Sequence, residues 1–119
     1  MNQQKQLSHR QLKIGQQIRF LISNFLIKED FIFEKFDCKD ITIVDVVVSS
    51  DLKHAKIYVT INSKFEHKFL IKELNNKSSF IQRRIASKLS VKFTPKLKFF
   101  YDSSFEYSGK INNILENIK

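Results

Sequence analysis

The stretch ITIVDVVVSSDLKHAKIYVTI, residues 41–61, decides the fold. Residues 41–48 are dense in β-branched side chains, which strands accept and helices disfavour. Residues 49–53 (SSDLK) have the composition of a turn. Residues 55–61 then alternate apolar and polar side chains, as expected for a half-buried strand. We therefore predict that the two strands pair as an antiparallel hairpin.

Helical spacing of apolar residues appears on both sides of this hairpin. A first helix is predicted from about Ser8, which is a suitable N-cap, to Lys28. Its apolar stripe consists of Leu7, Ile14, Ile18, Leu21, Ile22, Phe25 and Leu26. The charged residues 29–40 are predicted to form the connection to the hairpin.

Two shorter helices are predicted after the hairpin, separated by a polar break at Lys77-Ser78-Ser79. The second helix weakens near Asn75-Asn76, and its apolar residues are Phe65, Phe69, Leu70 and Leu74. The apolar residues of the third helix are Phe80, Ile81, Ile85 and Leu89. The break between these helices is the most informative local feature of the sequence.

A third strand is predicted from Lys96 to Asp102, directly after Thr94-Pro95, because a residue that precedes proline avoids the helical conformation. A short final helix is expected after Gly109. The order is therefore α-β-β-α-α-β. The predicted class is α+β, with a three-stranded sheet and helices packed on one face.

The length and composition of the chain limit the classes of protein to which it can belong. The chain has 119 residues, of which 42% are hydrophobic, and this suits one domain over residues 1–119 with flexible ends at 1–6 and about 104–119. Cys38 is the only cysteine, so an intramolecular disulfide cannot form, as expected in a reducing compartment. The polar N-terminus does not resemble a signal peptide, and no apolar run approaches the ~20 residues of a membrane span. We therefore expect a soluble, cytoplasmic protein.

The net charge of +9 is concentrated in the second half of the chain. Residues 1–60 contain nine Lys and Arg and seven Asp and Glu, whereas residues 61–119 contain twelve and five. No acidic residue occurs from Leu74 to Tyr101, where the basic residues are Lys77, Arg83, Arg84, Lys88, Lys92, Lys96 and Lys98. A fold that gathers these side chains presents a surface for a polyanion. The alternative is an ordinary solvated lysine surface.

Residues for catalysis are not grouped in the sequence. The three histidines lie far from one another and from Cys38, without metal-ligand spacing. Asp45, Asp51 and Asp102 are best interpreted as structural, and two isolated glycines cannot form a phosphate-binding loop. We therefore predict no enzymatic activity, no metal and no cofactor.

Two groups of residues suit RNA. In the third helix Arg83 points away from the apolar stripe and Arg84 and Lys88 lie along one edge, where they can pair with phosphates. The backbone amides near Ser78 and Ser79 add an anion-friendly helix start. In the third strand, a solvent-facing ring of Phe99-Phe100-Tyr101 can stack on a base, although core packing is the better interpretation for Phe99 and Tyr101.

Three segments together resemble the ribosome-binding factor A family of bacterial small-subunit assembly factors. They are the hairpin of residues 41–61, the broken helix pair from Leu74 to Leu89, and the proline-led strand Pro95–Ser103 that ends in Asp-Ser. The resemblance implies a type II KH-like fold with a helix-kink-helix near residues 75–80. It also implies binding to small-subunit rRNA near its 5′ region, a role in late maturation and rRNA processing, and growth in the cold.

The chain departs from the family pattern at the kink. The family commonly has Ala, any residue and Gly where this chain has Lys77-Ser78-Ser79, and an Arg where this chain has Gln82, so that Arg83 is expected to replace it. The predicted RNA-binding residues are Lys77, Ser78, Ser79, Arg83, Arg84, Lys88, Lys92, Lys96, Lys98 and Arg10. The expected partner is the immature small ribosomal subunit, bound by a monomer. The alternatives are a protein-binding adaptor and a general RNA-binding or chaperone protein.

Overall fold

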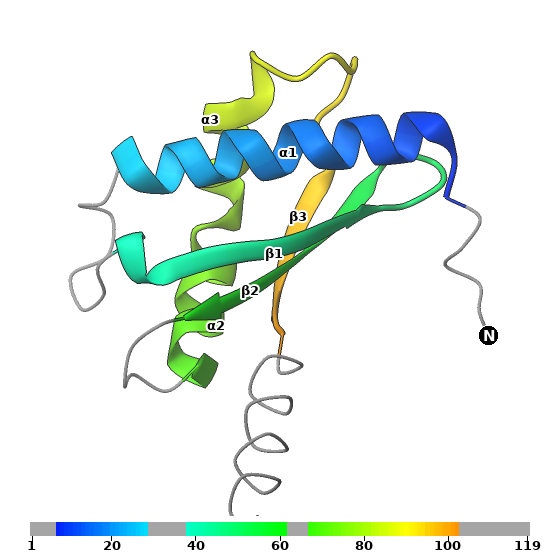
Figure 1. Cartoon of the computed structure of the whole chain (residues 1–119). Coiled ribbons are helices and arrows are strands. Elements are labelled where there is room, and N and C mark those ends of the chain that lie inside the picture. Colours follow the sequence, from blue (N-terminus) through cyan, green and yellow to red (C-terminus); the bar gives the residue numbers. More distant parts are fainter. Residues whose placement is uncertain (1–6, 29–37, 62–66, 103–119) are drawn as a thin grey trace, which may run out of the picture.

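The computed structural model describes residues 7–28, 38–61 and 67–102, shown in colour in Figure 1. Its elements are α1 (His9–Lys28), η3 (Cys38–Asp40), β1 (Ile41–Val48), β2 (His54–Ile61), α2 (His67–Asn76), α3 (Ser78–Ala86) and β3 (Lys96–Tyr101). The predicted α-β-β-α-α-β order is confirmed, with one added 3₁₀ turn before β1. The predictions for Phe65, for residues 29–37, for the final helix after Gly109 and for the two chain ends lie outside the described residues.

The three strands form one sheet in the order β1-β2-β3. β1 and β2 are antiparallel, as the hairpin prediction required, and β2 and β3 are parallel. Parallel strands need a crossover connection, which here is made by α2 and α3. The register of β1 shifts between Ile43 and Asp45, so Val44 is the extra residue of a β-bulge.

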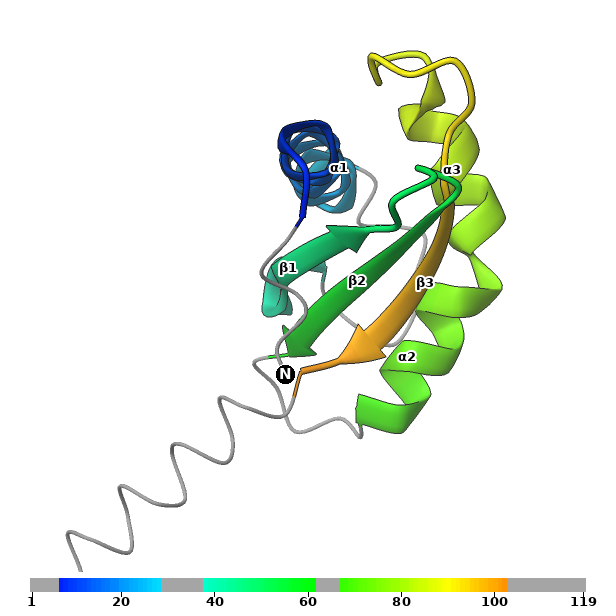
Figure 2. The ribbon, with the colours of Figure 1, turned by 90° about the vertical axis from the view of Figure 1, so that its right-hand side faces the viewer.

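The helices pack on one face of the sheet and bury the apolar residues of each strand. Buried strand residues include Ile43 on β1, Ile57 on β2 and Phe99 on β3. In Figure 2, α1 is seen nearly end-on while α2 and α3 run beside β3. The other face carries exposed and half-exposed side chains, and no described helix covers it. The fold is therefore the predicted α+β, KH-like sheet covered on one side.

Polar contacts fix how α1 sits on the sheet. The Gln11 amide N–H donates to Ser8 Oγ (3.1 Å) and the Ser8 N–H donates to Gln11 Oε1 (2.8 Å), a reciprocal capping box that confirms Ser8 as the N-cap. The buried Gln11 side chain also donates from Nε2 to the Val48 carbonyl at 2.8 Å. A Cβ on Gly15 would meet the Val46 carbonyl oxygen at 3.0 Å, so glycine allows the helix to approach β1 closely.

The helix break is shorter than predicted. Only Lys77 (φ −97°, ψ 4°) separates α2 from α3, and Ser78 and Ser79 already belong to α3. One residue outside the helical region is enough, because the Ile81 N–H then donates to the Lys77 carbonyl at 2.9 Å and starts the next helix.

The third helix also ends earlier than predicted, at Ala86 rather than near Leu89. The Lys88 N–H donates to the Ile85 carbonyl (3.1 Å) and the Leu89 N–H to the Ala86 carbonyl (3.3 Å), so the chain tightens into three-residue turns. Leu89 still reaches the core, with 8% of its surface exposed. Among the helices of the described ranges, none is long and apolar enough to cross a membrane.

Candidate nucleic-acid interface

The residues predicted to bind RNA lie on several surfaces rather than one. Arg10, Lys92 and Lys96 line a cavity at the turn end of the β1–β2 hairpin, hereafter the hairpin-end cavity. Arg84 and Lys88 line a second cavity between α1 and α3, hereafter the α1–α3 cavity. The remaining residues are Lys77, Ser78 and Ser79 at the helix break, Arg83 on the exposed side of α3, and Lys98 on the open face of the sheet.

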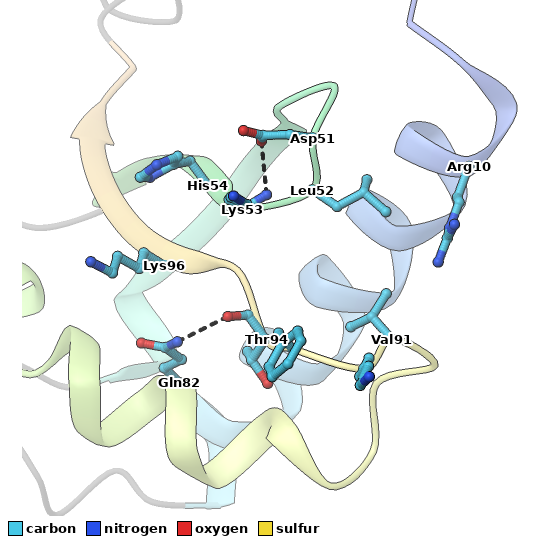
Figure 3. A pocket seen from close by; sticks show the side chains of 11 residues that line it. Arg10, Asp51, Leu52, Lys53, His54, Gln82, Val91, Thr94 and Lys96 are labelled. Atoms are coloured by element: carbon cyan, nitrogen blue, oxygen red, sulfur yellow. Dashed lines mark hydrogen bonds between the residues drawn. The ribbon is translucent and has the colours of Figure 1, made fainter.

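The hairpin-end cavity has a volume of about 590 Å³ and joins three segments that are distant in sequence. Figure 3 shows Arg10 on α1, residues 51–54 from the hairpin turn, and Val91, Thr94 and Lys96 from the segment that leads into β3. Its cationic side chains are those of Arg10, Lys53, Lys92 and Lys96, and Asp51 is the one acidic residue in its lining. The arrangement therefore concentrates positive charge in a concave site.

Hydrogen bonds hold the walls of this cavity together. Gln82 Nε2 on α3 donates to the Thr94 carbonyl at 3.1 Å, as Figure 3 shows. The Lys96 N–H donates to the Lys53 carbonyl at 2.9 Å and joins β3 to the hairpin turn. In that turn Leu52 adopts a positive φ of 61°, an uncommon conformation for a residue with a bulky side chain. The cavity is therefore built on a turn whose backbone conformation is locally strained.

Asp51, the one carboxylate in the lining of this cavity, is hydrogen-bonded within the hairpin turn. Asp51 Oδ1 accepts hydrogen bonds from Ser49 Oγ (2.6 Å) and from the Lys53 N–H (3.0 Å). The Ser49 hydroxyl, followed by the Lys53 amide, lowers the pKa of Asp51. This confirms the structural interpretation of Asp51, and the surrounding cations keep a net positive charge at neutral pH.

The α1–α3 cavity, of about 330 Å³, brings Arg84 and Lys88 together with Lys28 at the end of α1. The predicted shared edge of Arg84 and Lys88 is thus present, although Lys88 lies beyond the end of α3. The Arg84 guanidinium lies 5.6 Å from the Phe80 ring centroid and 6.0 Å from that of Phe25. These cation–π contacts hold Arg84 against α1, whereas exposed Arg83 faces away from the buried side of α3.

The helix break does not offer the amide of Lys77 to an anion. The Lys77 N–H donates to the carbonyls of Glu73 and Leu74, both at 3.1 Å, and so continues the bonding of α2. Lys77 makes no side-chain capping bond to α3. Ser79 is exposed and Ser78 is half-buried, so the break contributes side chains at the surface.

The predicted core packing of the β3 aromatic residues is confirmed for Phe99 but not for Tyr101, which is half-buried. Phe99 is buried, with 1% of its surface exposed, and Tyr101 stacks on His67 at 4.1 Å between ring centroids. Phe100 lies on the open face of the sheet beside Tyr58 of β2. The prediction did not include Lys53, His54 or Tyr58, although the alternation of β2 was a signal for the outward direction of His54 and Tyr58. Within the described ranges, no three His, Cys, Asp or Glu residues could together hold a metal ion.

Comparison with known proteins identifies the relatives of this chain. The family model described as ribosome-binding factor A matches residues 10–115. The chain belongs to the ribosome-binding factor A family. One relative, the ribosome-binding factor A of Pelagibacter ubique, is 33% identical over 112 residues, which cover 94% of this chain and 92% of the relative.

Two structural neighbours, one solved by NMR and one a fitted homology model, support the fold. A Thermotoga maritima protein, a candidate ribosome binding factor A studied by solution NMR, has a TM-score of 0.68 at 23% identity, covering 82% of this chain and 92% of that one. A homology model of Thermus thermophilus ribosome binding factor A, fitted into the cryo-EM map of its 30S complex, has a TM-score of 0.54 at 15% identity. It covers 82% of this chain and 97% of that model.

The structure explains one departure from the ribosome-binding factor A pattern. Gln82 takes the place of a commonly basic residue, and its side-chain amide donates to the Thr94 carbonyl instead of extending into solvent as a charge. Arg83, the next residue, is exposed. Arg83 therefore presents positive charge at the surface of this part of α3.

Proposed function

We propose that this protein is a non-catalytic assembly factor that binds the rRNA of the immature small ribosomal subunit, near its 5′ region. It assists late maturation and rRNA processing there, as a cytoplasmic monomer with one KH-like domain. The observation that carries the proposal is the hairpin-end cavity, where Arg10, Lys53, Lys92 and Lys96 converge and the one acidic residue is engaged locally. Family membership and the 30S complex of the Thermus thermophilus relative support the choice of partner.

The mechanism is docking by shape and charge. Lysine and arginine side chains displace the counterions of phosphate groups, and this stabilises the complex without reading the base sequence. The hairpin-end cavity, Arg83 and the α1–α3 cavity supply such side chains from a rigid sheet-and-helix scaffold. Binding of this kind stabilises one rRNA conformation until the subunit matures.

The test is salt-dependent binding to purified small subunits. With about five phosphate contacts to single-stranded RNA, the logarithm of affinity should fall with the logarithm of salt concentration at a slope of roughly −3.5. The double variant Arg10→Gln/Lys92→Gln, which removes two charges of the hairpin-end cavity, should weaken binding and reduce that slope by about 1.4, since each lost contact removes about 0.7. Removal of the same charge at exposed Lys68 and Lys72 on α2 is the matched control.

Two outcomes would overturn the proposal. An unchanged affinity and salt slope in Arg10→Gln/Lys92→Gln, with the fold intact, would remove the hairpin-end cavity from the interface. Cleavage of precursor rRNA by the pure protein with magnesium would show an enzyme instead.

A protein-binding adaptor is the second candidate, because three large apolar side chains on α1, those of Leu12, Phe20 and Ile27, are exposed. Phe20 is 66% exposed and Ile27 is 63% exposed, one helical repeat of seven residues apart. Binding through such an apolar patch is comparatively insensitive to salt. The salt slope on small subunits therefore separates the two candidates.

A further inference from the structure

The open face of the sheet carries a regular ladder of side chains across β2 and β3. The parallel register pairs residues directly opposite one another on this face: His54 with Lys96, Lys56 with Lys98, and Tyr58 with Phe100. Successive pairs are two residues apart along each strand, about 6.6 Å, so the ladder spans roughly 13 Å. It begins beside the hairpin-end cavity, whose lining includes His54 and Lys96.

One of the three pairs is unfavourable for the sheet alone. Lys56 and Lys98 are exposed, have the same charge and face each other across neighbouring strands, and like charges placed directly opposite destabilise a sheet. Neither β2 nor β3 contains an acidic residue that could compensate them. Asp45 on β1 lies opposite Tyr58, and its Oδ1 accepts a hydrogen bond from the Val46 N–H at 2.9 Å beside the bulge. The lysine pair is therefore complementary to a bound anion.

The third pair presents aromatic surface next to this charge. The rings of Tyr58 and Phe100 are stacked, with centroids 5.6 Å apart and an interplanar angle of 27°. Both side chains are half-buried on the uncovered face, and Lys98 Nζ lies 5.6 Å from the Phe100 ring centroid. Binding sites for single-stranded nucleic acid combine basic side chains, which bind the phosphates, with aromatic side chains, on which the bases stack.

We propose that this face is a second RNA-binding surface, in which Tyr58 and Phe100 stack on unpaired bases while Lys56, Lys98 and Lys96 bind the adjoining phosphates. The proposal rests on the proposed function for the identity of the polymer as RNA, and adds to it a surface that takes a single strand. A duplex is excluded from the rings because its bases are stacked on one another and not available to a flat surface. A protein partner is less well matched, since the ladder sets three lysine side chains beside a single pair of rings.

The experiment measures the affinity of the full chain for a fluorescein-labelled oligouridine of about ten nucleotides, a length within the range of single-strand sites on small domains. The double variant Tyr58→Ile/Phe100→Ile introduces β-branched, apolar side chains, which strands accept, and removes the aromatic faces. The wild type should bind the oligouridine, with quenching of intrinsic tyrosine fluorescence, and each lost ring should weaken binding roughly 5-fold or more. The affinity of the variant for an RNA duplex should differ from that of the wild type by about 2-fold or less, because the protein contacts the duplex through its phosphates.

Two control variants separate stacking from a structural role. Tyr58→Phe keeps the ring and should retain the wild-type affinity, whereas Thr42→Val changes an exposed side chain on β1 and should have no effect. Thermal denaturation of each variant shows whether the sheet is intact. If Tyr58→Ile/Phe100→Ile is less stable, Tyr58→Ile alone, measured well below its unfolding temperature, gives the same test.

Unchanged oligouridine affinity in a folded Tyr58→Ile/Phe100→Ile variant would overturn the inference, as would an equal loss of duplex and single-strand binding. Loss of binding to small subunits without loss of oligouridine affinity would point to a protein contact and would also overturn it. The proposed function fails separately: a wild type that binds the oligouridine through these rings but does not bind small subunits contradicts that function and leaves the single-strand surface standing.

Discussion

Within the described residues, Asn75 hydrogen-bonds to the free edge of β3, and its removal gives a sharp test of the fold. β3 is an edge strand, and Asn75 lies at the end of α2, two residues before the break at Lys77. The Phe99 N–H donates to Asn75 Oδ1 at 2.8 Å, and Asn75 Nδ2 donates to the Phe99 carbonyl at 3.1 Å. The side-chain amide thus takes the place that a neighbouring strand would occupy.

The substitution Asn75→Ala removes both hydrogen bonds. At roughly 0.5–1.5 kcal/mol for each bond, the free energy of unfolding should fall by about 1–3 kcal/mol. Since roughly 4 °C of melting temperature corresponds to 1 kcal/mol for a chain of this length, Tm should fall by about 4–12 °C. Asn76→Ala is the matched control, because Asn76 is the same residue type and is exposed. Replacing either asparagine by alanine raises the helix propensity of α2 by the same amount.

Urea denaturation of both variants measures the difference, and hydrogen exchange locates it. The Phe99 amide should exchange faster in Asn75→Ala than in Asn76→Ala, because its hydrogen-bond acceptor is gone. If the two variants unfold within about 0.5 kcal/mol of each other, the size of an ordinary surface substitution, the Asn75 bridge does not stabilise the edge.

Three further outcomes are expected. Gly15→Val should lower the free energy of unfolding by about 1–3 kcal/mol, because its Cβ would lie 3.0 Å from the Val46 carbonyl oxygen; a variant as stable as the wild type in urea would contradict this packing. Ser49→Ala should raise the pKa of Asp51 toward its ordinary value, measured by NMR titration of the carboxyl carbon, and an unmoved pKa would show that Ser49 is not the main cause. Ile18→Ala should cost about 2–5 kcal/mol in the same urea assay, since Ile18 is fully buried; a loss below about 1 kcal/mol would show that the cavity collapses.

Local sequence patterns predicted most of the helices and strands, because burial of one face of an element makes apolar residues recur at a fixed spacing. The β-branched run of 41–48 coincides with β1, and Ser8 caps α1 as expected. The bulge at Val44 was not predicted, since nothing in ITIVDVVV distinguishes an extra residue from a regular one. The register of β1 depends on the strand with which it pairs, β2, and so cannot be read from the sequence of β1 alone.

The site was harder to predict than the fold because it depends on contacts between distant segments. The acid-free window from Leu74 to Tyr101 located most of the cations but placed Arg84 and Lys92 on one surface, whereas the structure puts them in different cavities. The α3 end at Ala86 is the reason, because residues after it no longer follow helical periodicity. Asn75 was interpreted only as a weak helical residue, since its bonds to Phe99 span 24 positions.

The parallel pairing of β2 with β3 has a consequence for the time course of folding. The β1–β2 hairpin closes over a short turn, where the Ser49 N–H donates to the His54 carbonyl, and such hairpins form in about 1–10 μs. Joining His54 to Lys96 requires the whole α2–α3 crossover first, so loop-closure entropy delays it. The ladder of paired side chains therefore exists only after the last strand has joined. We expect that during refolding from urea, oligouridine binding will appear together with protection of the Phe99 amide, and binding that precedes this protection would contradict the order.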